Sequence, residues 1–363
     1  MTKNRIHIAT GDPLSRRGGL NTVVTNISIA QRDLGFDVDV FDEIKSPLLF
    51  RSWPEDSRKK RILDLYGKAN SKDSLIEFHF AQTAFLTFPI FMSQNTRSIF
   101  HFHGPWFLEG QVQGDNRVRV FAKRLVELIV YKNQNLMTTH SNAFKEVLLN
   151  EFKIPEEKVR VVYPGVNLDK FQLRDKEQAR QIFGLPSDQK VLLCIRRLEP
   201  RMGIHLAIDA MEHLADCVLV IAGTGSLAEK LREYANNKPY RNRIRFLGSV
   251  DEERHALIYN ASDVVVVPTL SVEGFGLIVW EAFASGIPVV ASRVGGLTEA
   301  LGDFSSDYSF EAGSLEDLVE KIQFALSNAI PAETFREAVE DRTWKNTAIA
   351  IEDFTYETYG HVN

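Results

Sequence analysis

The chain has 363 residues, more than one compact hydrophobic core usually holds, so two domains are expected. Its net charge of −5 argues against a nucleic-acid-binding protein, because such proteins usually carry a basic surplus. The amino terminus does not resemble a signal peptide, and no apolar run reaches the roughly 18 to 20 residues of a membrane span. We therefore expect a cytoplasmic protein.

The first half of the chain alternates short apolar runs with longer amphipathic segments. This rhythm predicts repeated strand–helix–strand units and a parallel sheet. A glycine-containing loop at 11–19 separates the first expected strand from a helix that ends near Leu34. The expected strands of this half are Arg5–Thr10, Asp37–Phe41, Leu75–Phe80, Ser98–Phe102, Leu136–Thr139 and Val159–Tyr163.

The pattern restarts after Pro164 and Gly165. The run VVVVP is almost entirely β-branched, as in a strand that is covered on both faces. We therefore predict an α/β protein with two domains, residues 1–164 and 165–342, and a last helix at 343–363 that packs back on the first domain. The expected strands of the second half are Val191–Ile195, Val218–Ala222, Ile244–Leu247, Val264–Pro268 and Pro288–Ser292.

Cys194 and Cys217 both stand inside apolar runs of this second half. Two thiols are too few for a disulfide framework or for a metal site with the usual number of ligands. We predict that both are buried small hydrophobic side chains in a reducing compartment.

The loop after VVVVP carries the strongest functional signal, since ligands of parallel sheets bind at the carboxyl ends of the strands. Its sequence TLSVEGFGLIVWE contains two glycines, Gly274 and Gly276, and leads into a helix. Free N–H groups and the helix dipole favour an anion at a helix start, and a diphosphate fits there. Glu273 and Glu281 are candidates to accept hydrogen bonds from hydroxyls of a sugar or ribose. The alternative is that these acids only stabilise the helix.

Two further loops follow expected strands. The segment IRRLEPRMG contains Arg196, Arg197 and Arg201, whose permanently charged guanidinium groups suit a diphosphate leaving group. A solvated basic loop is the alternative. Gly18 and Gly19 end the loop GDPLSRRGG and permit close approach of the backbone to a ligand, although any strand–helix turn can hold glycine.

Histidines and a glycine pair require separate interpretation. His101 and His103 end a strand in FHFHGPW, and His79 has a similar placement. A metal site through the His-x-His pair is disfavoured, because no acidic partner motif stands nearby. The segment VLVIAGTGSLA matches a dinucleotide fingerprint, but it lies in the middle of the second half and lacks the acidic residue expected about 20 positions on. We do not predict a nicotinamide or flavin site.

These segments together resemble glycosyltransferase family 4, the retaining enzymes of the GT-B fold. The stretch from RFLGSV to GGLTEAL resembles the donor-binding domain of that family, and the pair Glu273 and Glu281 is its most specific element. YPGVNLDKF, RRLEPRMG, the glycine pair, FHGPW and THSNAF match in order over nearly the whole chain. The resemblance implies two Rossmann-like domains that face each other across a deep cleft, an amino-terminal one for the acceptor and a carboxyl-terminal one for the nucleotide sugar.

The resemblance also implies a role for each matching residue. Glu281 would hold the ribose hydroxyls, Glu273 would bond hydroxyls of the transferred sugar, and Arg197 would neutralise the departing diphosphate. His103 would face the donor sugar, and Val250 would contact the base through its main chain. The remaining expected donor-binding residues are Gly18, Gly19, Gly223, Gly274, Phe275, Gly276 and Leu277.

One position departs from the family pattern. A lysine usually precedes the glycine of RRLEPRMG, and Met202 stands there in this chain. Methionine cannot hold a phosphate charge, so we expect Arg201 or Arg196 to substitute for the lysine. No metal and no other cofactor is expected, since arginines and a helix terminus can supply the positive charge.

The resemblance favours a UDP-sugar donor, with UDP-glucose first and GDP-mannose next. The expected acceptor is a glycan, a lipid-linked sugar or a small molecule, in the synthesis of polysaccharides or glycoconjugates. A non-catalytic sugar-nucleotide-binding protein and a sugar-nucleotide epimerase on the same scaffold are the alternatives.

Two basic runs, Arg58–Arg61 and Arg117–Arg124, are candidates for peripheral contact with anionic lipids, or else are solvated helix faces. The aromatic run Phe78–Met92 fits either the core or an acceptor groove.

Overall fold

The computed structural model describes residues 4–9, 18–42, 67, 74–91 and 97–360. The chain divides into two compact units. The first unit comprises residues 1–165 and 344–363, and the second comprises residues 166–343. Of the sequence segments discussed above, the basic run Arg58–Arg61 and most of the loop at 11–19 lie outside the described residues.

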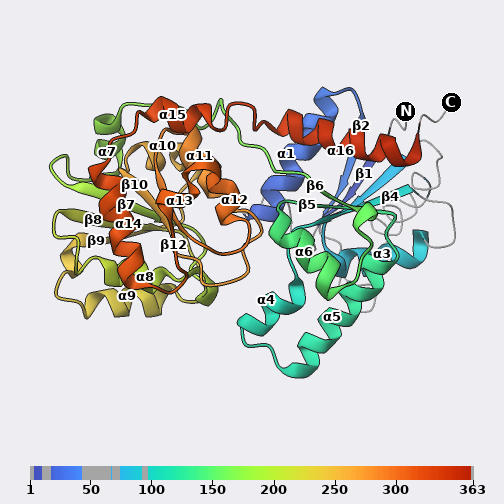
Figure 1. Ribbon diagram of the computed structural model, residues 1–363, viewed down its shortest axis with the longest axis horizontal. Coiled ribbons are helices and arrows are strands. Elements are labelled where there is room, and N and C mark those ends of the chain that lie inside the picture. Colours follow the sequence, from blue (N-terminus) through green and yellow to red (C-terminus); the bar gives the residue numbers. More distant parts are fainter. Residues whose placement is uncertain (1–3, 10–17, 43–66, 68–73, 92–96, 361–363) are drawn as a thin grey trace, which may run out of the picture. The chain divides into compact units, whose positions relative to one another are not determined.

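The first unit is built on a parallel sheet with the strand order β2-β1-β3-β4-β5-β6 (Figure 1). Its strands are β1 (Asn4–Ile8), β2 (Asp37–Phe41), β3 (Ser74–Phe78), β4 (Arg97–Phe102), β5 (Leu136–Thr139) and β6 (Val159–Val161). Its helices are α1 (Gly19–Asp33), α3 (Ala81–Phe91), α4 (Trp106–Val112), α5 (Arg117–Lys132), α6 (Asn142–Glu151) and α16 (Trp344–Tyr359), with a 3₁₀ turn η2 (Glu156–Lys158).

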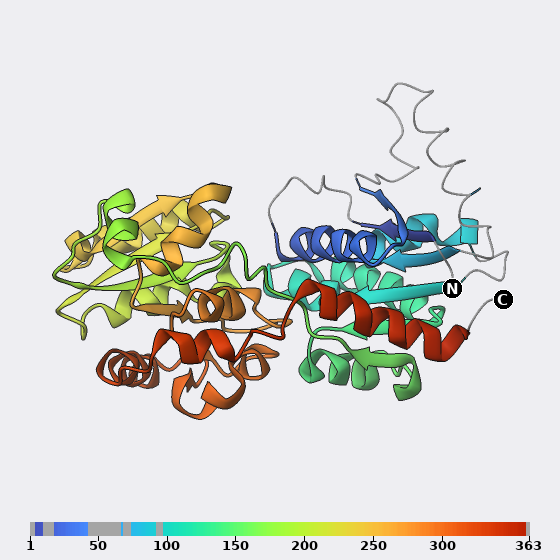
Figure 2. The same cartoon turned by 90° about the horizontal axis from the view of Figure 1, so that it is seen from above.

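The second unit has its own parallel sheet, in the order β12-β11-β10-β7-β8-β9. Its strands are β7 (Lys190–Ile195), β8 (Cys217–Ala222), β9 (Ile244–Gly248), β10 (Val264–Val267), β11 (Val289–Ser292) and β12 (Ser309–Phe310). Its helices are α7 (Lys176–Phe183), α8 (Ile204–Ala210), α9 (Ala228–Asn236), α10 (Glu252–Asn260), α11 (Leu277–Ala284), α12 (Leu297–Leu301), α13 (Ser305–Tyr308), α14 (Leu315–Ser327) and α15 (Ala332–Glu337), with 3₁₀ turns η3 (Pro200–Met202), η4 (Arg241–Arg243) and η5 (Gly302–Phe304). In each unit, helices lie on both faces of the sheet (Figure 2).

The strand predictions are confirmed, with ends that differ by two residues or fewer. The four valines of β10 are fully buried, which agrees with a central strand covered on both faces. Only β12 was not expected, because a strand of two residues shows no periodicity. Cys194 and Cys217 are both buried, as predicted, and burial raises the pKa of the Cys194 thiol to about 12.

The last helix, α16, packs against α1 in the first unit (Figure 1). Its Glu352 carboxylate accepts hydrogen bonds from Arg5 Nε of β1 (2.9 Å) and from Gln31 Nε2 of α1 (3.1 Å). Farther along the helix, the Tyr359 hydroxyl donates to the carbonyl of Ser98 (2.9 Å) at the start of β4. The helix is therefore attached to the first unit by partly buried polar contacts as well as by apolar packing.

A buried carboxylate organises the helices that follow β4. Glu127 of α5 is fully buried and accepts the backbone N–H groups of Trp106 (2.8 Å) and Phe107 (3.0 Å), which begin α4. The Tyr131 hydroxyl donates to the same carboxylate (2.9 Å). Burial raises the pKa of Glu127 from 4.5 to about 7, although these three donors lower it. Glu127 thus substitutes for a side-chain cap at the start of α4.

Glu127→Gln should remove a pH dependence of stability. Since the folded protein holds the carboxyl proton up to a higher pH than the unfolded chain, the stabilisation is present at low pH and is lost as the pH rises to about 7. Between pH 5 and pH 8, the unfolding free energy of the wild type should fall relative to Glu127→Gln by about 2 to 3 kcal/mol in urea titrations. Glu157→Gln, at an exposed position, is the control. If the difference in unfolding free energy between the wild type and Glu127→Gln is the same at both pH values, the raised pKa of Glu127 is contradicted.

Candidate active site

The glycine-containing loop after β10 leads directly into α11, as the sequence predicts. Gly276 occupies the cap position in the left-handed region (φ 84°), where a side chain is strained. Phe275 is buried and its ring packs edge-on against Trp280, with 4.5 Å between the centroids. The loop is therefore fixed by packing from within, and the first amides of α11 lie at the carboxyl edge of the sheet.

Glu273 of this loop forms an ion pair with Arg196. The Arg196 Nη2 atom, in the loop after β7, lies 2.6 Å from Glu273 Oε2, and the Thr269 hydroxyl donates to the same oxygen (3.3 Å). The side chain of Glu273 is 16% exposed and that of Arg196 is 8% exposed. Two other guanidinium nitrogens of Arg196 are buried and have no hydrogen-bond partner among the described residues.

The backbone around Glu273 is positioned by two neighbours. Val272 has a positive φ of 53°, and its carbonyl accepts a hydrogen bond from the Arg201 guanidinium. The Glu273 carbonyl accepts the N–H of Gly296 (3.1 Å), and Gly295 (φ 55°) lies so close that a Cβ there would overlap the same carbonyl oxygen. The loop thus depends on a glycine from the segment after β11.

Glu281 lies in the second turn of α11. The Tyr259 hydroxyl of α10 donates to Glu281 Oε2 (2.6 Å), and His255 Nε2 lies 3.9 Å from that oxygen. Burial and the Glu281 carboxylate raise the pKa of Tyr259 well above 10, so its hydroxyl remains a donor. The side chain of Glu281 is 16% exposed.

The structure distinguishes the arginines that the sequence placed in one loop. Arg197 is exposed, whereas Arg201 is buried and holds the backbone of Val272. Met202, which stands at the usual lysine position, is buried in the core. The expectation that Arg201 or Arg196 substitutes for that lysine stays a prediction, and both guanidinium groups are already bonded to the loop of Glu273.

The glycine pair after β8 has a packing explanation. A Cβ at Gly223 would overlap the carbonyl of Arg196, and a Cβ at Gly225 would overlap the backbone of Leu198. These glycines let the loop after β8 lie against the loop after β7. The nucleotide-binding roles of Gly223 and of Val250, which is buried just past β9, stay predictions.

At the start of α1, Gly18 and Gly19 have a different environment. A Cβ added at either glycine would meet no atom of the described residues within 4 Å. The packing of the described residues therefore does not require glycine at these positions.

The first unit collects five histidines at the carboxyl edge of its sheet. His7 lies on β1, His79 follows β3, His101 lies on β4, His103 follows β4 and His140 follows β5. Strand register places them together, because His7 is opposite Glu77 on β3 and His101 is opposite Thr138 on β5.

Sequence reasoning missed His7 and His140 of this cluster, and it also missed Glu77, which contacts the cluster. The expectation that the His-x-His pair has no acidic partner nearby was wrong, since Glu77 Oε2 lies 2.8 Å from His101 Nε2. Burial raises the pKa of Glu77, but His7, His101 and Arg5 lower it more, to about 2. The alternation Arg5-x-His7 inside a buried strand was the available signal, because it places two polar side chains on one face.

His7, Glu77 and His79 offer ligand atoms that lie within 4.8 Å of one another, as in a metal site. However, His7 Nδ1 and His79 Nε2 are 2.9 Å apart, which suits an N–H···N hydrogen bond. His103, predicted to face a donor sugar, has both ring nitrogens within hydrogen-bond distance of other histidines, and its role stays a prediction.

Comparisons with known proteins identify both units. Residues 17–170 match the family model described as glycosyltransferase family 4, and residues 175–342 match the model described as glycosyl transferases group 1. An uncharacterised glycosyltransferase of Methanocaldococcus jannaschii is 35% identical over 181 residues, which cover 48% of this chain and 46% of that protein. A D-inositol 3-phosphate glycosyltransferase of Mycolicibacterium smegmatis is 32% identical over 246 residues, 66% of this chain and 54% of that protein. This chain thus matches about half the length of these relatives.

Solved structures show the same fold. Sucrose-phosphate synthase from Thermosynechococcus elongatus superposes with a TM-score of 0.82 at 21% identity, covering 98% of this chain and 99% of that chain. Anabaena HepE in complex with UDP superposes with a TM-score of 0.77 at 18% identity, covering 98% of this chain and 100% of that one. The expected α/β GT-B fold is confirmed.

Gly295→Ala should displace the loop that carries Glu273. The new Cβ would overlap the Glu273 carbonyl in addition to straining a positive φ, so we expect a loss of more than about 2 kcal/mol in unfolding free energy. Gly184→Ala is a matched control, since Gly184 lies in the left-handed region (φ 60°, ψ 34°) with nothing within 4 Å of the added Cβ among the described residues, and should cost only about 1 to 2 kcal/mol. If both variants lose the same unfolding free energy in denaturant titrations, the contact with the Glu273 carbonyl does not require glycine at position 295.

Proposed function

Because the chain belongs to the group 1 glycosyltransferases of the family 4 type, we propose that it transfers a hexose, with glucose as first choice, from UDP-glucose to an acceptor. The acceptor is a glycan, a lipid-linked sugar or a small molecule, in the synthesis of polysaccharides or glycoconjugates. The transfer retains the configuration at the anomeric carbon.

The arrangement of Glu273 and Glu281 around the start of α11 is the observation that carries this proposal. Tyr259 occupies one oxygen of the Glu281 carboxylate and leaves Oε1 to accept ribose hydroxyls. Glu273 is mostly shielded beside Arg196, and its exposed part accepts hydrogen bonds from hydroxyls of the sugar. The amides and dipole of α11 attract the diphosphate between them. The choice of UDP-glucose is supported by Anabaena HepE, which has been crystallised with it.

Charge stabilisation of the leaving diphosphate is the main chemical task, because negative charge grows on it as the anomeric carbon becomes cationic. Arg197 is exposed, and Arg196 has two guanidinium nitrogens without partners among the described residues. These groups and the α11 terminus supply positive charge without a metal ion. No described residue lies within 4 Å of a Cβ at Gly18 or Gly19, which also agrees with the approach of a ligand to the start of α1.

A thermal-shift panel with UDP, GDP, ADP and their sugar conjugates tests the donor. UDP and UDP-glucose should stabilise the protein selectively, by about 2.7 kcal/mol at a hundredfold excess over Kd, and chelator should not change the shift. Glu281→Ala should weaken UDP binding about tenfold to a hundredfold, since it removes a charged hydrogen-bond acceptor. Glu320→Ala, an exposed acid on α14, is the control.

Failure of every nucleotide to shift the melting temperature contradicts the proposed donor site. The two alternatives are separated by product analysis. A binding protein without activity releases no UDP with any acceptor, and an epimerase converts the sugar without releasing UDP. A transferase releases UDP only when an acceptor is present.

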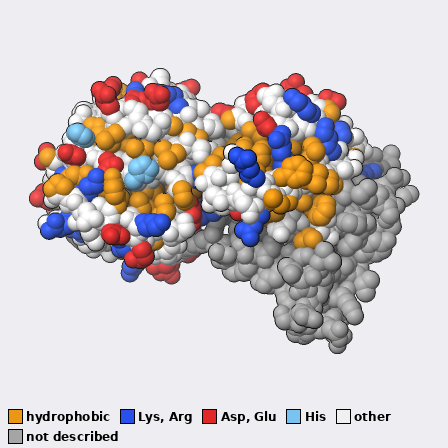
Figure 3. Space-filling model, turned by 90° about the horizontal axis from the view of Figure 1, so that it is seen from below, with side chains coloured by type: hydrophobic (Ala, Val, Ile, Leu, Met, Phe, Trp, Pro, Cys, Tyr) orange, Lys and Arg blue, Asp and Glu red, His pale blue; other side chains and the backbone are white. Residues whose placement is uncertain are grey.

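Peripheral contact with an anionic membrane is the second part of the proposal, and it is supported by an apolar stripe on α5. Val118 is 77% exposed and Phe121 is 68% exposed, and the stripe continues at intervals of three or four residues. Its members are Val118, Phe121, Leu125, Leu128 and Ile129. Exposed Arg117, Arg119 and Arg124 flank it on the same helix. Figure 3 shows hydrophobic side chains gathered over this part of the first unit beside basic ones.

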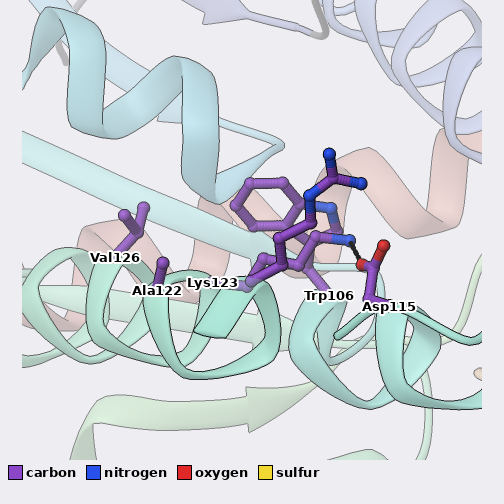
Figure 4. A pocket seen from close by; sticks show the side chains of 6 residues that line it. Trp106, Asp115, Ala122, Lys123 and Val126 are labelled. Carbon is purple, nitrogen blue, oxygen red and sulfur yellow. Dashed lines mark ion pairs between the residues drawn. The ribbon is translucent and has the colours of Figure 1, made fainter. Parts of the chain in front are cut away.

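A hollow next to the stripe also combines apolar and basic side chains. It is lined by Trp106, Asp115, Arg119, Ala122, Lys123 and Val126 (Figure 4). Lys123 Nζ lies 4.8 Å from the centre of the Trp106 ring and 2.6 Å from the Asp115 carboxylate. An indole beside basic side chains suits the boundary between headgroups and acyl chains. Among the described residues, no helix has the length and apolar character to cross a membrane.

Sedimentation with anionic liposomes tests this surface. The protein should pellet with them at low salt and less at high salt, because basic residues attract the lipid headgroups. Phe121→Glu should weaken binding about tenfold or more, since it replaces an exposed apolar side chain that would enter the membrane with a charged one. Ile182→Glu, at an apolar position of α7 that is 47% exposed, should not. No pelleting at low salt rejects the membrane contact.

A further inference from the structure

Four buried or partly buried histidines of the first unit form one continuous line of hydrogen bonds. His7 Nδ1 lies 2.9 Å from His79 Nε2, His79 Nδ1 lies 3.1 Å from His103 Nε2, and His103 Nδ1 lies 3.0 Å from His140 Nε2. We call His7, His79, His103 and His140 the histidine chain. One end meets Gln31 Oε1 (2.7 Å from His7 Nε2) and the other meets the Val162 carbonyl (3.2 Å from His140 Nδ1).

The two groups that the ends of the histidine chain meet can only accept hydrogen bonds. The Val162 carbonyl has no proton to donate. The orientation of the Gln31 amide is fixed, because its Nε2 donates to Glu77 Oε1 (2.7 Å) and to Glu352 Oε1 (3.1 Å). Its oxygen therefore faces His7 as an acceptor.

Counting protons gives a mismatch. The histidine chain makes five hydrogen-bond links, and each link needs one proton. The links are Gln31–His7, the three between neighbouring rings, and His140–Val162. Four neutral imidazoles supply one N–H each, four in all. A neutral chain therefore leaves one link with two facing acceptors, which is costly where water is excluded. One additional proton satisfies every link.

The charged groups around the histidine chain also favour one additional proton. Glu77 on β3 and Glu352 on α16 are carboxylates that accept N–H donors, and Arg5 on β1 is bonded to Glu352 and lies 3.8 Å from Glu77. Of these described groups, two are anionic and one is cationic. His7 Nε2 lies 3.7 Å from Glu77 Oε1, so a proton on His7 is next to a buried carboxylate. His101, which stacks on His79 at 4.6 Å, is bonded to Glu77 and Thr138 outside the chain.

We propose that the histidine chain holds one shared proton beyond those of four neutral rings, and that this proton moves between His7, beside Glu77, and His103. From a His7 imidazolium, the Nδ1 proton passes to His79 Nε2, and the His79 Nδ1 proton passes to His103 Nε2. His7 and His79 are then neutral with protons on Nε2, and His103 carries N–H on both nitrogens. All five links remain occupied in each state.

A second additional proton is excluded by repulsion. Burial and the neighbouring histidines together lower the pKa of all four rings, to about 4 for His140. Of the four rings, only His7 has a carboxylate, Glu77, that opposes this effect, although burial still keeps the pKa of His7 below its ordinary value of 6.5. Because His7 Nε2 lies 3.7 Å from the buried Glu77 carboxylate, the shared proton resides mainly on His7 when no ligand is bound.

The chain makes His7, His79 and His140 positioning residues for His103. His103 is less buried than the other three rings and lies at the carboxyl edge of the sheet, where ligands of such sheets bind. An anion near His103 draws the proton toward it without uptake from water. This role in activity rests on the proposed transferase function, whereas the shared proton does not.

Nitrogen-15 NMR of the histidine-labelled full chain at pH 7 tests the proton count. Five of the eight ring nitrogens of the histidine chain should be protonated, assigned through single histidine variants. Four protonated nitrogens would overturn the proposal. Spectra that change on addition of chelator would also overturn it, because they would indicate a metal bound by His7, Glu77 and His79.

Two variants at His140 sharpen the test. In His140→Gln, the glutamine can accept a hydrogen bond from His103 and donate one to the Val162 carbonyl. Four links then still need a proton from a ring, but only three rings remain. The shared proton therefore stays, and four ring nitrogens are protonated. His140→Leu removes both links, so three neutral rings suffice and three nitrogens are protonated. His213→Gln, at an exposed position of the second unit, should leave the spectrum of the chain unchanged.

Activity provides a separate outcome. His140→Leu should lower kcat of hexose transfer about tenfold or more, with UDP binding unchanged, and His140→Gln should restore most of it. If five ring nitrogens are protonated in the wild type and both variants transfer hexose equally fast, the role of His140 in positioning His103 is overturned. The shared proton itself is then still supported. If UDP does not bind the wild type, the proposed function fails and the NMR count still decides the proton.

Discussion

The first unit is organised around a carboxylate that has no access to water. Glu77 lies in β3, one of the two central strands of the sheet, and is fully buried, and an isolated charge in such a place is very unfavourable. Its oxygens accept from Gln31 and His101, and Arg5 lies nearby. These partners come from α1, β4 and β1, so satisfying one charge fixes the relative positions of three elements and, through Glu352, of α16.

The second unit is organised by close approach of backbones instead of by buried charge. Gly223 and Gly295 allow neighbouring loops to contact the carbonyls of Arg196 and Glu273, where any side chain would overlap. Arg201 contributes by holding the Val272 carbonyl, so a basic residue in a candidate phosphate loop has a structural task. Both units thus place polar groups at the carboxyl edge of a sheet, one through side-chain networks and the other through loop packing.

Much of the fold could be predicted from the sequence because its signals are local. The valines of β10 and the glycines and glutamates before α11 lie within one short segment, so the site around Glu273 could be located without a structure. The histidine chain could not, because its members come from β1 and from the segments after β3, β4 and β5 and meet only through strand register. The ion pair of Arg196 with Glu273 joins residues 77 positions apart, and no periodicity indicates such a pair.

The hydrogen bonds between Arg5 and Glu352 join residues 347 positions apart. During translation, β1 and α1 leave the ribosome early, whereas α16 is made only after all of the second unit. Until then, the guanidinium of Arg5 and the amide of Gln31 lack one of their carboxylate partners, and the face of α1 that α16 covers is open. The second unit has all its strands by that time. The order of synthesis therefore makes the second unit the first to complete its core, and the unit that begins the chain is the last to close.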